Sequence, residues 1–342
     1  MSYIYIFIYA DFGDFYIGEG IISVLKNPLA QFRPGWRAHK NRVPLARRLK
    51  NEWQLYLLLL PALVYLFIFQ YLPMYGIQIA FRDYKAVFGI TGSPWVGLHF
   101  FRLFFSTYYW QRLITNTFLL NFYGLLWGFP IPVILALLLN RIEMRRFKKF
   151  TQTTIYVPHF ISTVVMAGMI YIFLAPSNGV INRLITALGG SSQFFMVQAS
   201  SFRTIFIGSG IWQGAGWGTI VYLAVLTSID QEMYEAATID GATILQKIRY
   251  IDIPSIIPVA MMMLILNCGS LLSSNTQKAL LLQTNGNIAT SDVIGLYVYK
   301  MGLVNARFSF SSAIGLMMNV INFVMLITVN TISKRTNEVS IV

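Results

Sequence analysis

Residues Tyr234 to Pro254 read YEAATIDGATILQKIRYIDIP and separate two long apolar runs with polar and charged residues. The run Glu235-Ala236-Ala237 favours a helix, whereas Gly241 provides a position at which the chain can turn sharply. The proline that closes the stretch fits the first turn of a following helix, where a missing N–H has no partner to lose. The stretch therefore predicts a short helix, a turn and a second helix that re-enters the apolar part of the protein.

The composition is that of an integral membrane protein. Hydrophobic residues make up 56% of the 342 positions, charged residues make up 11%, and the mean hydropathy is +0.59. In soluble domains, charged residues are about a quarter of the chain. A bilayer core about 30 Å thick requires about 20 apolar residues per helix. Because the apolar runs are long and do not alternate with polar residues, they predict transmembrane helices.

We expect six such helices. They cover Trp53–Phe81, Leu113–Leu139, Thr154–Ala175, Phe202–Leu226, Pro254–Ser274 and Phe308–Ile332. With the N-terminus inside, the tail, the inner connections and the C-terminal end carry 17 of the 26 lysines and arginines. The positive-inside rule therefore predicts that both termini and the opening stretch are cytoplasmic. Residues 1–52, rich in Lys, Arg and Pro, form a predicted cytoplasmic tail held near anionic lipid, and binding to nucleic acid is not expected.

The opening stretch resembles the EAA signature of ABC importer permeases, EAA-x3-G-x9-I-x-L-P. The residues that match it, including the D-G-A core of the sugar-importer version, are Glu235, Ala236, Ala237, Asp240, Gly241, Ile251 and Pro254. Ile253 stands where this family usually has Leu, and the change keeps an apolar side chain. Further phrases, among them YVPHFISTVV from Tyr156 and DVIGLYVYKMG from Asp292, resemble permeases for complex oligosaccharides and lipo-oligosaccharides within the maltose-type sugar permease family.

This resemblance implies a fold class and a set of partners. The fold is an all-α membrane protein, the type I ABC importer transmembrane domain, over residues 53–342, with a cytoplasmic coupling loop over 227–253. The partners are a dimer of ATP-binding-cassette ATPase subunits, a second homologous permease subunit, an extracytoplasmic substrate-binding protein and an oligosaccharide. ATP and Mg²⁺ belong to the ATPase, so this chain needs no cofactor. The expected location is the bacterial cytoplasmic (inner) membrane.

No catalytic pattern stands in the sequence. It lacks G-x4-G-K-[ST], H-E-x-x-H and G-x-S-x-G, so we expect a permease subunit that is not an enzyme. One alternative is a secondary transporter that couples to an ion gradient without an ATPase. Such transporters often carry carboxylates within their spans, whereas the 13 acidic residues here fall outside the predicted spans or at their edges.

Neutral amides and aromatic rings at membrane depth suit a sugar, whose hydroxyls need hydrogen bonds and whose C–H faces stack on rings. The candidates for a substrate path are Asn121, Gln213, Trp217, Asn267 and Asn319. For each of them alone, hydrogen bonding between helices is an alternative role. Several basic residues expected near the outer face suit an acidic substrate such as a uronate oligomer: Arg102, Arg183, Arg203, Lys300 and Arg307. Contacts with lipid headgroups explain these basic residues equally well.

Overall fold

The computed structural model describes residues 53–273 and 275–337 of the chain. The predicted tail, residues 1–52, lies outside the described residues, so its role and the domain boundary at 52/53 stay predictions. The described part is helical, and its β-pairing is confined to two isolated bridges, Arg82 with Trp95 and Lys85 with Gly89. Internal contacts divide the chain into two units, Met1–Leu72 and Pro73–Val342.

The described part of the first unit is one apolar helix. It comprises α4 (Trp53–Leu66), which contains Pro61, and the π-helical segment η2 (Phe67–Tyr71), and neither has a buried residue. The helix continues through α5 (Leu72–Met74) and η3 (Tyr75–Phe81), for 29 residues in all. These bounds coincide with the first predicted span.

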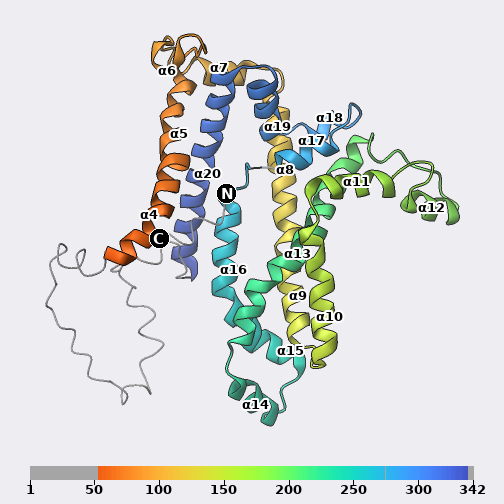
Figure 1. The fold of residues 1–342 in the computed structure, drawn as a ribbon. Coiled ribbons are helices and arrows are strands. Elements are labelled where there is room, and N and C mark those ends of the chain that lie inside the picture. Colours follow the sequence, from red (N-terminus) through yellow and green to blue (C-terminus); the bar gives the residue numbers. More distant parts are fainter. Residues whose placement is uncertain (1–52, 274, 338–342) are drawn as a thin grey trace. The chain divides into compact units, whose positions relative to one another are not determined.

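The second unit contains the remaining helices, most of which are labelled in Figure 1. In chain order they are α6 (Gly89–Gly92), α7 (His99–Ser106), α8 (Trp110–Gly128), α9 (Pro130–Asn140), α10 (Arg145–Tyr156), η4 (Val157–Phe160), α11 (Thr163–Phe173), α12 (Val180–Ala187), α13 (Ala199–Thr227), α14 (Gln231–Ile239), α15 (Ile244–Lys247), η5 (Ile248–Asp252), α16 (Ile253–Cys268), α17 (Thr276–Leu282), α18 (Ile288–Ser291), α19 (Ile294–Tyr299), η6 (Lys300–Val304) and α20 (Phe308–Asn337).

Four of the predicted spans overlap described helices that are long and apolar enough to cross a membrane. These helices are Trp53–Phe81, Trp110–Asn140, Ile244–Cys268 and Phe308–Arg335. The predicted span Phe202–Leu226 lies within α13, which has 29 residues but is less apolar, because glycines and polar residues such as Gln213 interrupt it.

The third predicted span is not straight. Residues Arg145–Phe160 and Thr163–Phe173 form a pair of helices bent by 99°, which counts as a fifth span only if the pair is taken as one. Ser162 begins the second helix as its N-cap, and its side chain accepts a hydrogen bond from the Val165 N–H. A capped start gives α11 its own N-terminus, so the apolar run contains a break that its hydropathy conceals.

The fifth predicted span differs at both ends. The helix begins at Ile244, not at Pro254, and ends at Cys268, before Ser274. Pro254 lies in the first turn of α16, as the sequence predicts, but η5 joins α16 to α15 without a break. In this π-helical segment the Ile253 N–H reaches back to the Ile248 carbonyl, which adjusts the backbone just before the proline.

Helix α13 runs through the centre of the second unit. Phe202 and Phe206, near its start, pack in an apolar cluster with residues of α8, α11, α17 and α19. Tyr222 and Leu226, near its end, pack in another cluster with α9 and α16. A third cluster joins α7, α8, α19 and α20. Below, the two ends of α13 are called the α18 end and the α14 end, after the helices that lie there in Figure 1.

Two glycines bring α13 close to its neighbours. A Cβ on Gly216 would lie 1.8 Å from the backbone oxygen of Ile155 in α10, and a Cβ on Gly218 would lie 3.1 Å from Pro132 in α9. Gly214, in contrast, has no atom within 4 Å of its Cβ position. Gly216 and Gly218 therefore permit helix packing, whereas Gly214 leaves open space.

Candidate functional site

The predicted coupling loop is a helix, a tight turn and a second helix. Asp230 caps α14 by accepting a hydrogen bond from the Glu232 N–H, and the Ala242 N–H closes the other end on the Ala237 carbonyl at 2.9 Å. Gly241 adopts a φ of +75°, which residues with a Cβ rarely adopt. Thr243 and Gln246 form a capping box that starts α15. The turn predicted at Gly241 is therefore present.

A buried ion pair attaches this loop to the helices around it. Asp252 is fully buried in η5, pairs with Arg141 at the end of α9, and accepts a hydrogen bond from the Tyr234 hydroxyl of α14 at 2.5 Å. The Arg141 guanidinium also lies over the Tyr234 ring, 5.4 Å from its centre. Burial and the hydrogen bond to Asp252 raise the pKa of Tyr234 to about 12. We call these three residues the Asp252 brace.

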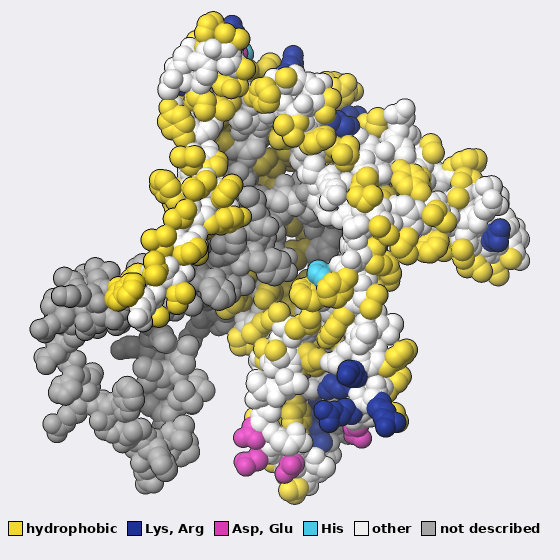
Figure 2. Space-filling model, in the orientation of Figure 1, with side chains coloured by type: hydrophobic (Ala, Val, Ile, Leu, Met, Phe, Trp, Pro, Cys, Tyr) yellow, Lys and Arg dark blue, Asp and Glu magenta, His cyan; other side chains and the backbone are white. Residues whose placement is uncertain are grey.

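The outer face of the loop combines apolar and acidic side chains. Glu235, Ala236 and Asp240 are exposed, while Ala237 and Ile251 are half-buried and Pro254 is exposed. Three large apolar side chains are also exposed, Met233 at 50%, Ile239 at 87% and Leu245 at 77%. Figure 2 shows acidic side chains gathered here, beside basic side chains at the start of α10. This face, from Met233 to Leu245, is called the loop face below.

A cavity of about 640 Å³ lies midway along α13, between its two apolar clusters. Its walls come from α8, α9, α13, the end of α16 and the start of α17, with His159 of η4. Three of the predicted substrate-path residues, Asn121, Gln213 and Asn267, line it. Each of them donates a hydrogen bond to a backbone carbonyl of a residue behind the lining, at 2.6–2.8 Å. Among the described residues, no group donates to their side-chain oxygens, which are free to accept hydrogen bonds from a ligand.

The other two predicted residues do not line the cavity. Trp217 stacks on His159, with ring centres 4.5 Å apart, so it supports a residue of the cavity wall. Asn319 is exposed on α20. His159 therefore both lines the cavity and packs against Trp217.

The sequence also gave no reason to select Lys278. This lysine lies in α17 and appears in the sequence only as one more basic residue between two spans. Its side chain is 3% exposed, lines the cavity, and donates a hydrogen bond to the Phe206 carbonyl of α13 at 2.5 Å. In the sequence, both Lys278 and Lys300 simply follow an apolar run. That position does not indicate which of the two lysines is buried in a cavity.

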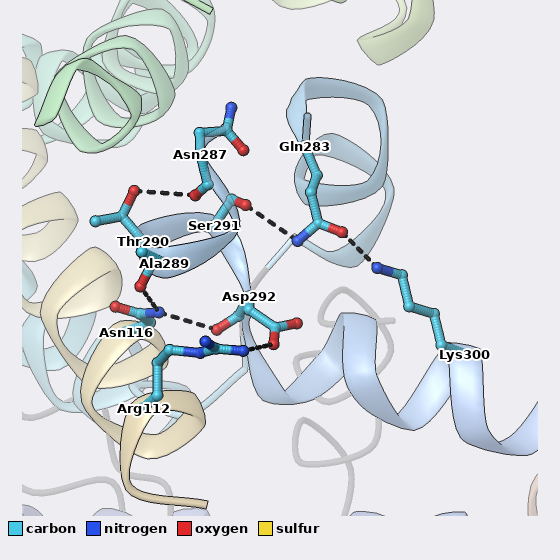
Figure 3. A network of polar contacts seen from close by, with 9 residues as sticks. All are labelled: Arg112, Asn116, Gln283, Asn287, Ala289, Thr290, Ser291, Asp292 and Lys300. Carbon is cyan, nitrogen blue, oxygen red and sulfur yellow. Dashed lines mark hydrogen bonds and ion pairs between the residues drawn. The ribbon is translucent and has the colours of Figure 1, made fainter. Parts of the chain in front are cut away.

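A polar network holds the α18 end together (Figure 3). Arg112 of α8 binds the carboxylate of Asp292 at 2.9 Å, and Asn116 donates to the carbonyls of Ala289 and Asp292. Lys300 donates to Gln283, which in turn donates to Ser291. Outside the view of Figure 3, Arg203 donates to the side-chain oxygen of Asn116.

The network has two consequences for the sequence interpretation. Of the basic residues proposed for an acidic substrate, Arg203 and Lys300 are engaged with neutral side chains of the protein. The two buried carboxylates of the described chain, Asp252 and Asp292, are both paired with arginines. Asp252 lies inside the helix Ile244–Cys268, so not every acidic residue is outside the apolar helices. Its pairing nevertheless leaves it unsuited to binding a transported ion.

Two proteins of Bacillus subtilis are similar to this chain over most of its length. LplB of Bacillus subtilis (strain 168) is 40% identical over 290 residues, covering 85% of this chain and 91% of LplB. The polygalacturonan/rhamnogalacturonan transport system permease YteP of the same organism is 39% identical over 300 residues, covering 87% of this chain and 93% of YteP.

A crystal structure of a bacterial ABC transporter involved in the import of the acidic polysaccharide alginate is also similar. It matches with a TM-score of 0.79 and 38% identity, over 86% of this chain and 99% of the matched chain. The same type of transporter, in complex with an alginate pentasaccharide-bound periplasmic protein, matches with a TM-score of 0.80 and 37% identity, over 87% of this chain. The family model for binding-protein-dependent transport system inner membrane components matches residues 128–338. The chain is a multi-pass permease of an ABC importer for oligosaccharides and belongs to the binding-protein-dependent transport system inner membrane component family.

Proposed function

We propose that this chain is one of two channel-forming subunits of an ATP-driven importer that carries an acidic oligosaccharide, built from uronate units, across the bacterial cytoplasmic membrane. A dimer of ABC ATPases binds the loop face, and an extracytoplasmic binding protein delivers the sugar at the α18 end. One observation carries the proposal: two features lie along the same helix, α13. A cavity lined by amides lies midway along it, and a loop with exposed apolar and acidic side chains follows its α14 end.

The loop face has the composition of a docking surface. Covering exposed apolar side chains such as Ile239 and Leu245 with a partner lowers the free energy of the complex. Glu235 lies on the same face and is available to a basic residue of that partner, since no described residue of this chain pairs with it. The Asp252 brace holds α14 against η5 from the other side. An ATPase subunit bound here therefore contacts a loop whose position is fixed relative to the cavity helices.

The acidic substrate class is supported by the relatives. Polygalacturonan, named for YteP, and alginate, named for the similar crystal structure, are both polymers of uronic acids. The cavity volume, about 640 Å³, lies within the range of sites that enclose small ligands. It holds a few sugar rings at most, so a longer oligosaccharide passes through it progressively or occupies it with one end.

The first test uses the assembled importer in membrane vesicles, with uptake measured for matched oligosaccharides. The probes are trigalacturonate, an alginate trisaccharide and a neutral trisaccharide of glucose. We expect ATP-dependent uptake of at least one acidic probe, which collapse of the ion gradient leaves unchanged. Uptake of the neutral probe alone would refute the acidic substrate class.

The second test concerns the cavity. Replacing Asn121, Gln213 or Asn267 by Ala should raise the half-saturation concentration for uptake about tenfold, because each change removes hydrogen-bonding groups from the wall. Asn319→Ala is the matched control, since this amide lies outside the cavity, and it should leave uptake unchanged. Equal effects of all four changes would show that the cavity does not hold the substrate.

A further inference from the structure

The cavity wall contains one basic side chain, Lys278, that has no acidic partner within the described residues. The lysine is 3% exposed, and its ammonium donates to one carbonyl, that of Phe206. The three ion pairs of the described chain involve other residues, so no described carboxylate lies within 4.0 Å of the ammonium. A buried cation without a counter-ion is costly, and the cost falls when an anion enters.

The ammonium lies at the cavity wall among neutral groups. It sits 4.6 Å from the centre of the Phe206 ring and beside Gly210, where a Cβ would lie only 3.1 Å from the nitrogen. The missing side chain of Gly210 therefore leaves space on α13 that the ammonium itself occupies. An ammonium has three N–H donors, and the Phe206 carbonyl uses one of them. Two donors remain for a ligand in the cavity.

The neutral side chains of the cavity complete a site for one acidic sugar unit. Asn121, Gln213 and Asn267 offer amide oxygens to hydroxyl groups, and the stacked His159–Trp217 pair places an aromatic face at the wall. A carboxylate is a single charged group on such a sugar ring. One lysine among neutral acceptors matches that chemistry, whereas a neutral sugar would leave the cation unpaired.

We propose that Lys278 is the specificity-determining residue of the cavity and that its ammonium binds the carboxylate of a uronate unit during transport. This inference rests on the proposed function, because it requires that the importer carry an acidic oligosaccharide. It differs from that proposal in assigning the selectivity to one residue of this permease, in addition to any selectivity of the binding protein.

The test restores the charge chemically at one position. Cys268 is the only cysteine of the chain, so Lys278→Cys is made in a cysteine-free importer that carries Cys268→Ala. The variant is treated with 2-aminoethyl methanethiosulfonate, which adds an ammonium, or with ethyl methanethiosulfonate, which adds a chain without charge. We expect uptake of trigalacturonate or the alginate trisaccharide to fall at least tenfold in Lys278→Cys. The ammonium reagent should restore most of it, and the neutral reagent should not. Restoration also shows that the variant is folded and assembled.

Lys300→Met is the matched control, because it removes a lysine that donates to Gln283 outside the cavity lining. It should leave uptake within about twofold of the unmodified importer, because the hydrogen bond that it removes lies outside the cavity lining. Unchanged uptake in Lys278→Cys, or equal restoration by both reagents, would overturn the role of Lys278 while the proposed substrate class stands. Absence of acidic uptake in the unmodified importer, with neutral uptake present, would overturn both.

Discussion

Removing the Asp252 carboxylate should release α14 from the helices that hold it. In Asp252→Ala, Arg141 loses its counter-ion and Tyr234 loses the acceptor of its hydroxyl. Because Asp252 is fully buried, water cannot replace these contacts without a rearrangement of the loop. We expect the loop face to detach from the rest of the protein while the apolar clusters of α13 remain intact.

The structure sets the size of the effect. Breaking a buried ion pair by removal of one partner costs about 3–5 kcal/mol, which raises the fraction of molecules with an open loop by about two to four powers of ten. Tyr234→Phe removes only the hydrogen bond to the carboxylate, about 1.5–3 kcal/mol, or about one to two powers of ten. Asp230→Asn changes the charge of the same loop but keeps an N-cap of equal quality, so it should cost a few tenths of a kcal/mol at most.

Hydrogen exchange of residues 231–252 in the purified importer measures the open fraction directly. The number of ATP molecules hydrolysed per sugar imported then reports the functional consequence. Exchange should accelerate in the order Asp230→Asn, Tyr234→Phe, Asp252→Ala, and the ATP cost of import should rise in the same order. If Asp252→Ala exchanged and transported like Asp230→Asn, the brace would not be what holds α14, and our reasoning would be wrong.

Three further predictions concern other parts of the chain. Gly216→Ala should lower the free energy of unfolding of the importer by about 3 kcal/mol or more, because the added Cβ meets the backbone of α10. Gly208→Ala, in the same helix, adds a Cβ in open space and should be neutral or stabilising. Denaturation followed by tryptophan fluorescence compares the two, and equal stabilities would contradict the close packing. Glu235→Lys should leave the chain in the membrane but reduce copurification of the ATPase, and full retention of the ATPase would remove this carboxylate from the interface. Reporter fusions should read outside at Gly189 and inside at Gly241, and the reverse result would invert the topology.

The sequence predicted the helices best where one physical signal was strong. Four apolar runs were long enough to define their own spans, and the turn at Gly241 was readable because few residues other than glycine adopt its φ. The break at Ser162 was missed because its flanks, Ile161 and Val164, keep the run apolar. The sequence did not predict that the helix before Pro254 continues into α16, because a π-helical turn such as η5 has no recognisable sequence pattern.

The site was predictable in type but only partly in detail. Polar residues inside apolar runs led to Asn121, Gln213 and Asn267, which the structure places in the lining of one cavity, while their role in binding a substrate stays a prediction. Asn319 follows the same rule but is exposed on α20 and does not line the cavity, and hydropathy does not distinguish the faces of a helix. Lys278 was missed for a different reason, because its burial depends on contact with α13, 72 residues earlier in the sequence.

The continuous helix from Ile244 to Cys268 has a mechanical consequence. Its 25 residues span about 37 Å, with the capping box of the loop at one end and the cavity residue Asn267 near the other. A rotation of 10° about its loop end would carry the far end through about 6 Å, more than the width of a sugar hydroxyl group and its hydrogen bond. A small displacement at the loop end of this helix would thus be amplified into a change of cavity shape, and by thermodynamic reciprocity a sugar in the cavity would alter how readily the loop end moves.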